Sequence, residues 1–419
     1  MRAFYSCLFY LIVPFILARL IWRSIKAPAY RYRWGERFAL YNQRFAQDVI
    51  WFHAVSVGEA EALFPLVKQI QLQHPDEKLL ITTTTPTGSA RVKAVMREDA
   101  EHVYLPYDMP DAINRFMRCF RPKMAVIMET EIWPNLFACC GRNEVPLYII
   151  NARLSEKSAN GYQKITALVS QALGNVKLIA AQTEDDAKRF LAIGAKTEKV
   201  RTLGNIKFDV DVPSEVIRQG EQLKADLFSG RFVWLIASTH KDEEFIFLEI
   251  YNEIKREIPE LLLVVVPRHP ERFGEVKKLC DRYGLAVVTR TSGGPCYQST
   301  DVYLADTMGE LKMLYSASDV AFIGGSMVPV GGHNILEAAA VGTPVLFGPY
   351  MANFKAIAEG VLIQGAAVQC QNKDEIIQTI IALYADSAFR QSLAEKGKAF
   401  VLRNQGAITK IVDILSQDI

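Results

Sequence analysis

The feature that most constrains the fold of this chain is a regular alternation of short apolar runs with segments of helical periodicity. The runs are rich in valine, isoleucine and leucine, and most are followed by glycine, hydroxyl or charged residues. In the first half of the chain they cover residues 48–55, 78–84, 102–105, 123–128, 145–150, 177–181 and 199–203. Strands that alternate with helices form parallel sheets covered on both faces, so this half predicts a doubly wound α/β domain.

The alternation starts again after a polar, helical stretch at residues 211–230, which contains Pro213 and Gly220 and is predicted to be a linker. The second series of runs covers residues 232–237, 261–266, 285–289, 302–304, 320–323 and 345–347. A chain of 419 residues is too long for one hydrophobic core. We therefore expect two Rossmann-like domains, residues 26–210 and 231–419, that face each other across a cleft.

Residues 1–25 form a separate apolar segment that is predicted to be a membrane anchor. Residues 3–18 are apolar apart from Ser6, and the run continues past Arg19 to roughly the length that crosses a bilayer. Pro14 lies within the run, and both a helix that spans the membrane and one that lies in its interface fit the pattern. The cations that follow place the domains on the cytoplasmic side by the positive-inside rule. A hydrophobic N-terminal helix of a soluble protein is the alternative.

Charge is unevenly distributed along the chain. Residues 1–40 carry seven basic side chains and one acidic one, a net charge of +6 in a chain whose total is +2, so the remainder carries −4. A nucleic-acid-binding protein would instead carry basic faces on its folded domains. The seven cysteines and six histidines show no metal-ligand spacing, so no metal site is predicted. The absence of GxxxxGK[ST] and of GxGxxG after a first strand counts against ATPases and dehydrogenases.

The most informative stretch is Val320–Gly348, where a buried strand, a glycine-rich turn (Gly324–Gly332), a helix from about Asn334 to Val341 and a second strand follow one another. Four glycines in the turn indicate close approach of the backbone to a ligand, with N–H groups at the start of the helix directed at an anion. Glu337, one turn into the helix, is placed to accept hydrogen bonds from ribose hydroxyls. The pattern predicts a nucleotide-sugar site, and a glycine-rich loop without a ligand is the alternative.

Polar residues also follow the neighbouring strands of the second domain. Ser238 and Thr239 end its first strand, and Arg268 and His269 follow its second. The carboxyl ends of parallel strands meet at one edge of a sheet, so we expect these residues and Asn334 to surround one phosphate group.

In the first domain, carboxylates follow two of the strands. Ser56, Gly58 and Glu59 follow the first strand, and Glu129 and Glu131 follow the fourth. Buried carboxylates are costly unless they are paired, which marks this edge as a candidate catalytic site. A purely structural role also fits Glu59, because a carboxylate at the start of a helix complements the helix dipole.

The two edges together fit the transfer of a sugar from a nucleotide. A carboxylate of the first domain would take the proton of the acceptor hydroxyl, while N–H groups and arginine of the second would stabilise the departing phosphate. Trp133 offers an aromatic face of the kind that stacks on sugars, and Arg153 and Lys157 offer charge for an anionic group, although surface cations are common. The sequence lacks an Asp-x-Asp pair in a nucleotide loop, which counts against a metal-bound diphosphate leaving group.

Seven motifs, in this order, resemble those of the bacterial transferases of 3-deoxy-D-manno-oct-2-ulosonic acid (Kdo) in lipopolysaccharide assembly, and the resemblance covers nearly the whole chain. They are HAVSVGE (53–59), ETEIWPN (129–135), NARLSEKS (151–158), GNIKFD (204–209), ASTHKDEE (237–244), VPRHPERF (266–273) and GGHNILEAAAVGTPVLFGP (331–349). The resemblance implies an inverting glycosyltransferase of the GT-B architecture that needs neither a metal nor a cofactor. It would move Kdo from CMP-Kdo to the lipid A precursor (lipid IVA) at the cytoplasmic face of the inner membrane.

The resemblance also implies roles for individual residues. Glu59 would be the general base, and one glutamate of ETEIWPN, either Glu129 or Glu131, would be essential. The residues implied to hold CMP are Arg268, Asn334, Glu337, Gly331 and Gly332. The donor sugar and the phosphorylated acceptor are both anionic, and the cations available to bind them are Arg153, Lys157 and Lys207.

Two other hypotheses fit part of the pattern. One is another sugar-nucleotide enzyme of similar architecture, such as a UDP-dependent transferase or a UDP-sugar epimerase, and the N-terminal anchor counts against the epimerase. The other is a membrane-tethered protein that binds a sugar nucleotide or lipid without catalysis, and the Glu59 and ETEIW motifs count against it.

Overall fold

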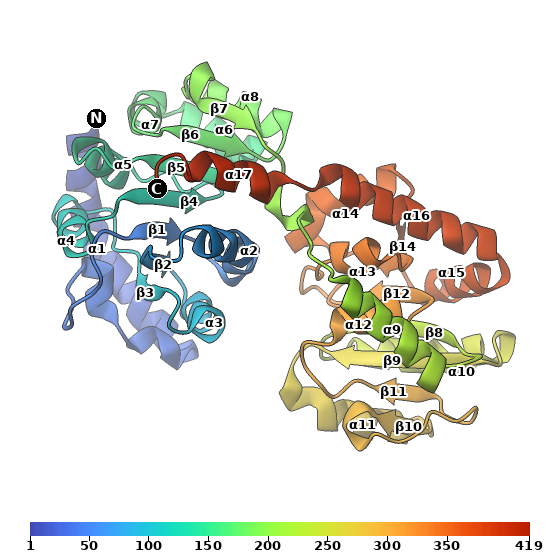
Figure 1. Cartoon of the computed structure of the whole chain (residues 1–419). Helices are drawn as coiled ribbons and strands as arrows, with labels where there is room; N and C mark the ends of the chain where they lie inside the picture. The colour runs from blue at the N-terminus through green and yellow to red at the C-terminus, as the bar shows by residue number, and fades with distance from the viewer. The chain divides into compact units, whose positions relative to one another are not determined.

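The computed structural model describes all 419 residues and divides into two compact α/β units (Figure 1). Unit 1 comprises Met1–Asp209 and Gln405–Ile419, and unit 2 comprises Val210–Asn404. Each unit contains one seven-stranded sheet, and all the strand pairs in both sheets are parallel. The predicted fold class, two Rossmann-like α/β domains, is confirmed.

In unit 1 the strand order is β3-β2-β1-β4-β5-β6-β7. The strands are β1 (Ile50–His53), β2 (Leu79–Thr83), β3 (Glu101–Tyr104), β4 (Met124–Met128), β5 (Leu147–Ala152), β6 (Leu178–Ala181) and β7 (Val200–Thr202). All four residues of β1 are buried, which explains why this strand is a continuous apolar run rather than an alternating one. Trp51 packs into the core on one face of the sheet, and Ile50 and Phe52 pack into the core on the other.

The helices of unit 1 cover both faces of this sheet. They are α1 (Arg2–Lys26), α2 (Val57–Gln73), α3 (Pro86–Met96), α4 (Pro110–Phe120), α5 (Pro134–Arg142), α6 (Glu156–Gln163), α7 (Thr166–Leu173), α8 (Glu184–Ala192) and α17 (Ala407–Leu415). By length and composition, α1 alone is long and apolar enough to cross a membrane. Thr85 caps α3 by accepting a hydrogen bond from Gly88 N, at 3.1 Å. The hydroxyl groups that follow β2 therefore serve, at least here, to start a helix.

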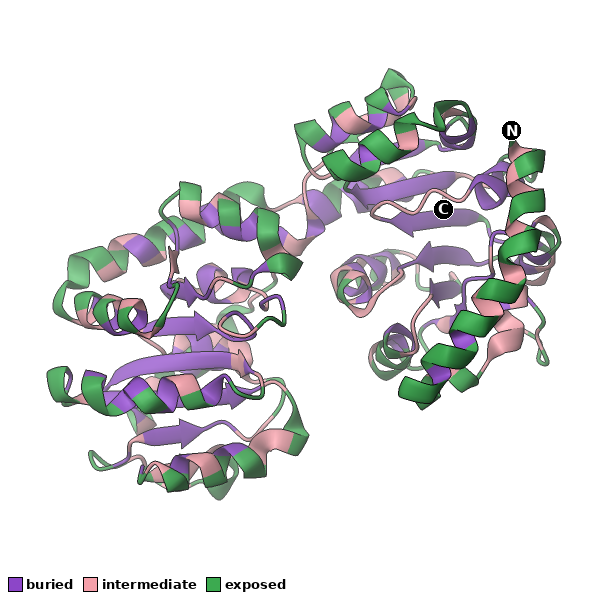
Figure 2. Cartoon of the chain, turned by 180° about the vertical axis from the view of Figure 1, so that it is seen from behind, coloured by how far each residue is buried: buried purple, intermediate pink, exposed green.

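In unit 2 the strand order is β10-β11-β9-β8-β12-β13-β14. The strands are β8 (Phe232–Thr239), β9 (Leu261–Pro267), β10 (Val287–Thr289), β11 (Val302–Leu304), β12 (Val320–Ile323), β13 (Val345–Phe347) and β14 (Val368–Gln369). The helices are α9 (Ser214–Leu227), α10 (Glu244–Glu257), α11 (Phe273–Arg282), α12 (Leu311–Ser316), α13 (Leu336–Val341), α14 (Lys355–Ile363), α15 (Lys373–Ala385) and α16 (Ser387–Asn404). The central strands β1, β4, β8, β9 and β12 are almost entirely buried, whereas β7, at the border of its sheet, has two exposed residues (Figure 2).

The boundaries of the units differ from the predicted ones in two places. Residues 211–230 are not a free linker, because α9 packs against α12 of unit 2; a Cβ at Gly220 would lie 2.4 Å from the carbonyl oxygen of Met313. The final segment, 405–419, belongs to unit 1 rather than to the second domain. Its helix α17 buries apolar side chains in the unit 1 core, and Asp209 accepts hydrogen bonds from the backbone at its start.

Candidate functional sites at the two sheet edges

The candidate residues of each unit gather where the direction of strand order reverses. In unit 1 this point lies between β1 and β4, and in unit 2 it lies between β8 and β12. At such a point the loops that follow the two strands diverge, and the crevice outside their carboxyl ends is where doubly wound sheets bind ligands. We call these two regions the unit 1 edge and the unit 2 edge.

At the unit 1 edge, Glu59 lies in the first turn of α2 and is tied to the loop before it. Its carboxylate accepts hydrogen bonds from Val55 N and Ser56 Oγ, both at 2.9 Å, while Ser56 Oγ accepts one from Glu59 N at 3.4 Å. This reciprocal arrangement is a form of the capping box. Glu59 therefore has the structural role that helix capping predicts, and it does not exclude a chemical one. Burial raises the pKa of Glu59, the charge of Glu129 raises it further, and the Val55 and Ser56 hydrogen bonds oppose the rise.

The structure brings Glu129 and Glu131 to the same edge as Glu59. Burial raises the pKa of Glu131 to about 7, and the negative charges of Glu59 and Glu129 contribute to the rise. Lys207 Nζ lies 4.0 Å from Glu129 Oε1, so one cation accompanies the three carboxylates. Glu129 has a positive φ of 56°, an uncommon conformation for a side-chain-bearing residue and one that often marks a functional site.

Lys207 is held in place by a network of amide side chains that the sequence did not single out. It lies in a short 3-10 turn, Ile206–Phe208, whose first N–H donates to Asn151 Oδ1 at 3.2 Å. Gln182 Nε2 donates to the Asn151 carbonyl oxygen at 2.9 Å, and Asn205 Nδ2 donates to Gln182 Oε1 at 3.0 Å. Asparagine in both NARLSEKS and GNIKFD was the signal available, because a buried amide usually fixes backbone.

Beside Glu131 is a pocket of about 260 Å³ with mostly apolar walls. Its lining residues are Tyr5, Thr130, Glu131, Ile132, Trp133, Pro134, Tyr162, Ile165, Leu168 and Val169. Trp133 thus faces a space next to a carboxylate, as its predicted role of stacking on a sugar requires. Tyr5 comes from α1, so the N-terminal helix forms part of this wall.

The other two cations predicted to bind anionic groups in unit 1 have fewer contacts with the protein than Lys207 has. Arg153 and Lys157 are exposed and form no ion pair, although both lie just after β5 at the carboxyl end of the sheet. Gly58 is exposed in the first turn of α2, one residue before Glu59. Glu61, by contrast, points away to an exposed ion pair with Arg91.

At the unit 2 edge, the N–H groups of the glycine-rich turn are partly occupied by the protein itself. Glu243 is completely buried, and its carboxylate accepts hydrogen bonds from the turn after β12. The donors are the N–H groups of Gly325, Ser326 and Met327, at 2.7, 3.1 and 3.0 Å. This first part of the turn therefore offers no N–H groups to a ligand, and the prediction of an anion site concerns only the N–H groups at the start of the following helix. The N–H groups of Gly325, Ser326 and Met327 hold an internal anion that fixes the shape of the turn.

The second half of the turn keeps unpaired N–H groups. The backbone N–H groups of His333, Asn334 and Ile335 have no acceptor within the chain. Asn334 Oδ1 accepts from Leu336 N at 3.0 Å, so α13 begins at Leu336 rather than at Asn334 and is only six residues long. Gly332 has a φ of +72°, and a Cβ there would lie 2.2 Å from Met351 Sδ, so only glycine fits.

Next to these N–H groups is a cluster of three histidines that the sequence analysis only partly identified. His240 and His333 stack with their ring planes 6° apart and their Nε2 atoms at 2.7 Å, and His269 meets His240 edge-on at 5.6 Å between ring centroids. The pKa of His333 is lowered to about 4, chiefly by burial, with contributions from the neighbouring imidazoles and Arg268. Arg268 forms no ion pair, although its charge lowers the pKa of both His240 and His333. We call these four residues the histidine–arginine cluster.

The hydroxyl of Thr239 is not available to a ligand at this cluster. It is buried, and its hydroxyl donates to Glu244 Oε1 at 2.6 Å. Glu244 also forms a nearly buried ion pair with Arg272, so these three side chains join β8, α10 and the segment after β9. Thr239 is therefore a structural residue here rather than one available to a phosphate. Ser238, in contrast, has a positive φ of 59° and a partly exposed side chain at the edge.

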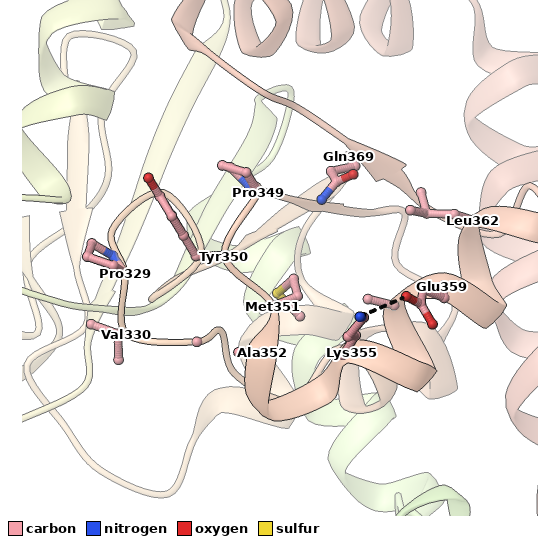
Figure 3. A pocket seen from close by; sticks show the side chains of 12 residues that line it. Pro329, Val330, Pro349, Tyr350, Met351, Ala352, Lys355, Glu359, Leu362 and Gln369 are labelled. Atoms are coloured by element: carbon pink, nitrogen blue, oxygen red, sulfur yellow. Dashed lines mark ion pairs between the residues drawn. The ribbon is translucent and has the colours of Figure 1, made fainter. Parts of the chain in front are cut away.

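A second pocket, of about 570 Å³, adjoins the glycine turn (Figure 3). It is bounded by Gly331, by the segment after β13, and by α14, where Lys355 and Glu359 form an ion pair at 3.8 Å. Its remaining lining residues are Pro329, Val330, Pro349, Tyr350, Met351, Ala352, Ala358, Leu362 and Gln369. Its volume is that of a small-molecule site, and its mixture of ring, apolar and amide surfaces suits a ligand such as a sugar.

Glu337 lies in the first turn of α13 with a partly buried side chain, at the same edge as the histidine–arginine cluster. The chemistry available at the two edges is thus different. The unit 1 edge offers carboxylates with raised pKa values, which suit proton transfer. The unit 2 edge offers an unpaired guanidinium, imidazoles and free N–H groups, which suit an anionic ligand.

Comparison with known proteins gives consistent matches. The family model described as 3-deoxy-D-manno-octulosonic-acid transferase (kdotransferase) matches residues 32–210, and the model of glycosyl transferases group 1 matches residues 239–400. The 3-deoxy-D-manno-octulosonic acid transferase of Haemophilus influenzae is 38% identical over 417 residues, 99% of this chain and 98% of that protein. The protein of the same name from Bordetella pertussis is 35% identical over 375 residues, 87% of this chain and 86% of that protein. Among solved structures, UDP-GlcNAc 2-epimerase from Neisseria meningitidis is 17% identical, covers 88% of this chain and 99% of its own, and has a TM-score of 0.56, so it shares the fold.

Proposed function

The chain belongs to the family of 3-deoxy-D-manno-octulosonic acid (Kdo) transferases and is a glycosyltransferase, and from this premise we propose that it moves Kdo from CMP-Kdo to the lipid A precursor, lipid IVA, in lipopolysaccharide assembly. The observation that carries the proposal is the division of chemistry between the two edges. Carboxylates with raised pKa values lie at the unit 1 edge, and an unpaired arginine lies beside free N–H groups at the unit 2 edge.

We assign the proton transfer to Glu59. Its carboxylate takes the proton of the acceptor hydroxyl as that oxygen forms a bond to the anomeric carbon of Kdo. The bond from that carbon to the CMP phosphate oxygen breaks on the opposite face, so the configuration inverts and CMP leaves with the electron pair. Glu131 carries a proton for much of the time at neutral pH, since its pKa is about 7, and this lowers the negative charge around the Glu59 carboxylate.

We place the CMP phosphate in the histidine–arginine cluster. Arg268 and the N–H groups of His333–Ile335 supply the positive charge that the leaving group needs, so we propose that no metal ion is required. Ser238 and Asn334 border this position, and Glu337 accepts hydrogen bonds from the ribose hydroxyls. Gly331 and Gly332 keep the backbone of the turn close to the phosphate.

The anionic groups of the donor sugar and the acceptor are assigned to the cations of unit 1. Lys207 lies among the carboxylates and is placed to bind the Kdo carboxylate. Arg153 and Lys157 are exposed and suit a phosphate of the acceptor. Ser56 and Gly58 shape the loop on which Glu59 is held.

The experiment that tests this function uses the purified full chain with CMP-Kdo generated in situ and lipid IVA. Mass spectrometry should show a product heavier by whole Kdo residues, and thermal unfolding should be delayed by CMP but not by UDP. EDTA should leave the rate unchanged. Protection by UDP alone would assign the donor to another nucleotide, and strong EDTA inhibition that Mg²⁺ reverses would overturn the metal-free mechanism.

A further inference from the structure

The imidazole rings of His240 and His333 meet across the unit 2 edge. His240 follows β8 and His333 follows β12, so their contact joins two loops that start from neighbouring strands. Their Nε2 atoms are 2.7 Å apart, their ring planes differ by 6°, and their ring centroids are 5.0 Å apart. Because the nitrogens are so much closer together than the ring centres, the two Nε2 atoms point toward each other.

A contact of this kind needs one proton between the two nitrogens. Two lone pairs or two N–H groups at 2.7 Å would repel each other, so one ring donates from Nε2 and the other accepts there. The accepting ring then carries its own proton on Nδ1, and both rings are neutral. The contact is therefore a hydrogen bond that fixes the tautomer of both residues.

The backbone beneath the two rings is held by one buried carboxylate. Glu243 Oε2 accepts hydrogen bonds from His240 N at 3.2 Å and from Gly325 N at 2.7 Å. Gly332 N, one residue before His333, donates to the Gly325 carbonyl oxygen at 2.8 Å. A Cβ at Gly325 would lie 3.3 Å from His240 Cδ2 and 3.2 Å from His333 Cδ2, so the rings meet over this glycine. The imidazole pair thus completes a loop of contacts that begins and ends at Glu243.

His333 is also the first of the residues whose backbone N–H groups are free. The N–H groups of His333, Asn334 and Ile335 have no acceptor within the chain. Their directions depend on the backbone conformation of this short segment, and the imidazole of His333 attaches the segment to the loop after β8. Loss of the His240 ring would release that attachment without removing any of the three N–H groups.

The charged groups around the pair favour its neutral form. They lie on the segment after β9 and at the start of α10, and they are Arg268, His269, Arg272, Glu243 and Glu244. Both carboxylates are engaged elsewhere, Glu243 with backbone N–H groups and Glu244 with Arg272. Burial, and after it the neighbouring imidazoles and arginines, lower the pKa of both rings, that of His333 to about 4. Near neutral pH the pair therefore holds one shared proton and no net charge.

We propose that His240 is a positioning residue of the donor site. Its hydrogen bond with His333 holds the N–H groups of His333–Ile335 in the directions that bind the phosphate of CMP, and its ring does not itself contact the phosphate. The inference rests on the proposed function, which places that phosphate in the histidine–arginine cluster. The competing role for His240 is direct binding of the phosphate as a charged imidazolium.

Two substitutions in the full chain separate these roles. His240→Leu removes the hydrogen bond, whereas the amide of His240→Gln is uncharged and can donate to or accept from His333 Nε2. Calorimetry with CMP should show about three- to tenfold weaker binding for His240→Leu, the value of one hydrogen bond, and nearly unchanged binding for His240→Gln. Equal weakening by both variants would assign His240 to the phosphate itself and overturn the proposal.

The pH dependence of CMP binding gives a second readout, which a purely structural role would not move. The quantity is the ratio of the affinities of the unmodified protein and His240→Leu, in which the protonation of CMP itself cancels. A neutral pair gives the same ratio at pH 8 and pH 6. A phosphate-binding imidazolium would make the ratio rise as pH falls through about 6.5, the ordinary pKa of histidine, and that rise would contradict the positioning role.

Nuclear magnetic resonance tests the shared proton without any ligand. The chain has six histidines, so a protein labelled with ¹⁵N only at histidine gives a spectrum simple enough to assign with the His240→Gln variant. Of His240 and His333, one should carry its proton on Nε2 and the other on Nδ1. The same tautomer in both residues would overturn the pair.

The outcomes also separate this inference from the function on which it rests. Absence of CMP binding by the unmodified protein would overturn the proposed function and this inference with it. CMP binding that His240→Leu leaves unchanged would overturn this inference alone.

Discussion

The unit 1 edge and the unit 2 edge occupy the same position in two sheets of the same kind, and they carry opposite chemistry. The unit 1 edge holds Glu59, Glu129 and Glu131 with a single lysine, whereas the unit 2 edge holds the histidine–arginine cluster. In both, burial is the largest influence on the shifted pKa values, and it moves them in opposite directions.

This difference shows how one topology supports two tasks. Burial raises the pKa of Glu131 and lowers that of His333, so it favours the uncharged form of each. Carboxyl groups with raised pKa values, such as Glu59 and Glu131, are suited to exchange protons near neutral pH. Buried imidazoles with lowered pKa values, beside an unpaired arginine, are suited to receive an anion without strong repulsion among the groups of the site. The sheet supplies the position, and the residues after each strand decide the task.

The largest expected effect comes from removing the proposed catalytic carboxylate of the unit 1 edge. Glu59→Gln should lower the rate of Kdo transfer by about 10²–10⁴-fold, because a general base contributes that much. Binding of CMP should be unchanged, since it depends on the other unit. Rates from product mass spectrometry and CMP affinity from calorimetry check both statements.

The control for this variant is Glu61→Gln, two residues further along the same helix. Its side chain forms only an exposed ion pair with Arg91, so its rate should match that of the unmodified enzyme. Glutamine at position 59 can still accept a hydrogen bond from Val55 N, so the melting temperature should fall little. Substantial transfer by Glu59→Gln would remove Glu59 as the base.

The next effect concerns pH and the carboxylate with the highest pKa. Glu131 has a folded-state pKa of about 7, above its ordinary value, so between roughly pH 4.5 and 7 the folded protein holds a proton that the unfolded chain releases. The unfolded chain binds fewer protons in this window, so stability decreases as pH rises through it. Glu131→Gln removes this dependence and should gain stability relative to the unmodified protein, by up to about 3 kcal/mol above pH 7.

Urea unfolding at pH 5 and at pH 8 measures this difference. Four of the five tryptophans lie in unit 1, so tryptophan fluorescence mainly follows the unfolding of that unit. Glu61→Gln serves again as the control and should show the same difference at both pH values. A Glu131→Gln difference that does not change with pH would show that Glu131 is ionised normally in the folded protein.

The smallest expected effect concerns the binding of CMP at the unit 2 edge. Arg268→Ala should weaken CMP binding by about 10–100-fold, the value of one or two charge-assisted hydrogen bonds, with no loss of stability because Arg268 has no carboxylate partner. Arg272→Ala is the informative contrast, since Arg272 pairs with the nearly buried Glu244 and its loss should destabilise unit 2. Calorimetry with CMP and thermal unfolding measure the two quantities. A CMP affinity of Arg268→Ala equal to that of the unmodified enzyme would exclude Arg268 from the donor site.

Much of the fold and the placement of the candidate residues could be predicted from the sequence. Apolar runs with a strand's length and alternation with helices specify parallel sheets, and a residue that follows a strand must lie at the carboxyl edge. By this logic, Glu59, Glu129 and Glu131 belong at the carboxyl edge of the first sheet, and Arg268 and His269 belong at that of the second. Only β14, two residues long, was missed among the strands.

What the sequence could not indicate depends on contacts between distant residues. An N–H group is free for a ligand only if no group of the protein accepts its hydrogen bond. Glu243, which accepts hydrogen bonds from the glycine turn, lies more than eighty positions before that turn in the sequence. Thr239 looked like a phosphate ligand for the same reason, because its pairing with Glu244 is visible only in three dimensions. The stacking of His240 on His333 joins the loops after β8 and β12, which no local pattern links.

The return of α17 to unit 1 has a consequence for how the chain is made. Ile408, Ile411, Val412 and Leu415 belong to the unit 1 core, yet they follow the whole of unit 2 in the sequence and leave the ribosome after it. Unit 2 is complete in sequence before they emerge, so during synthesis the inserted unit can finish folding while the unit that encloses it in sequence still waits for its final helix. Nascent unit 1 therefore spends the whole time of unit 2 translation with part of its apolar interior uncovered.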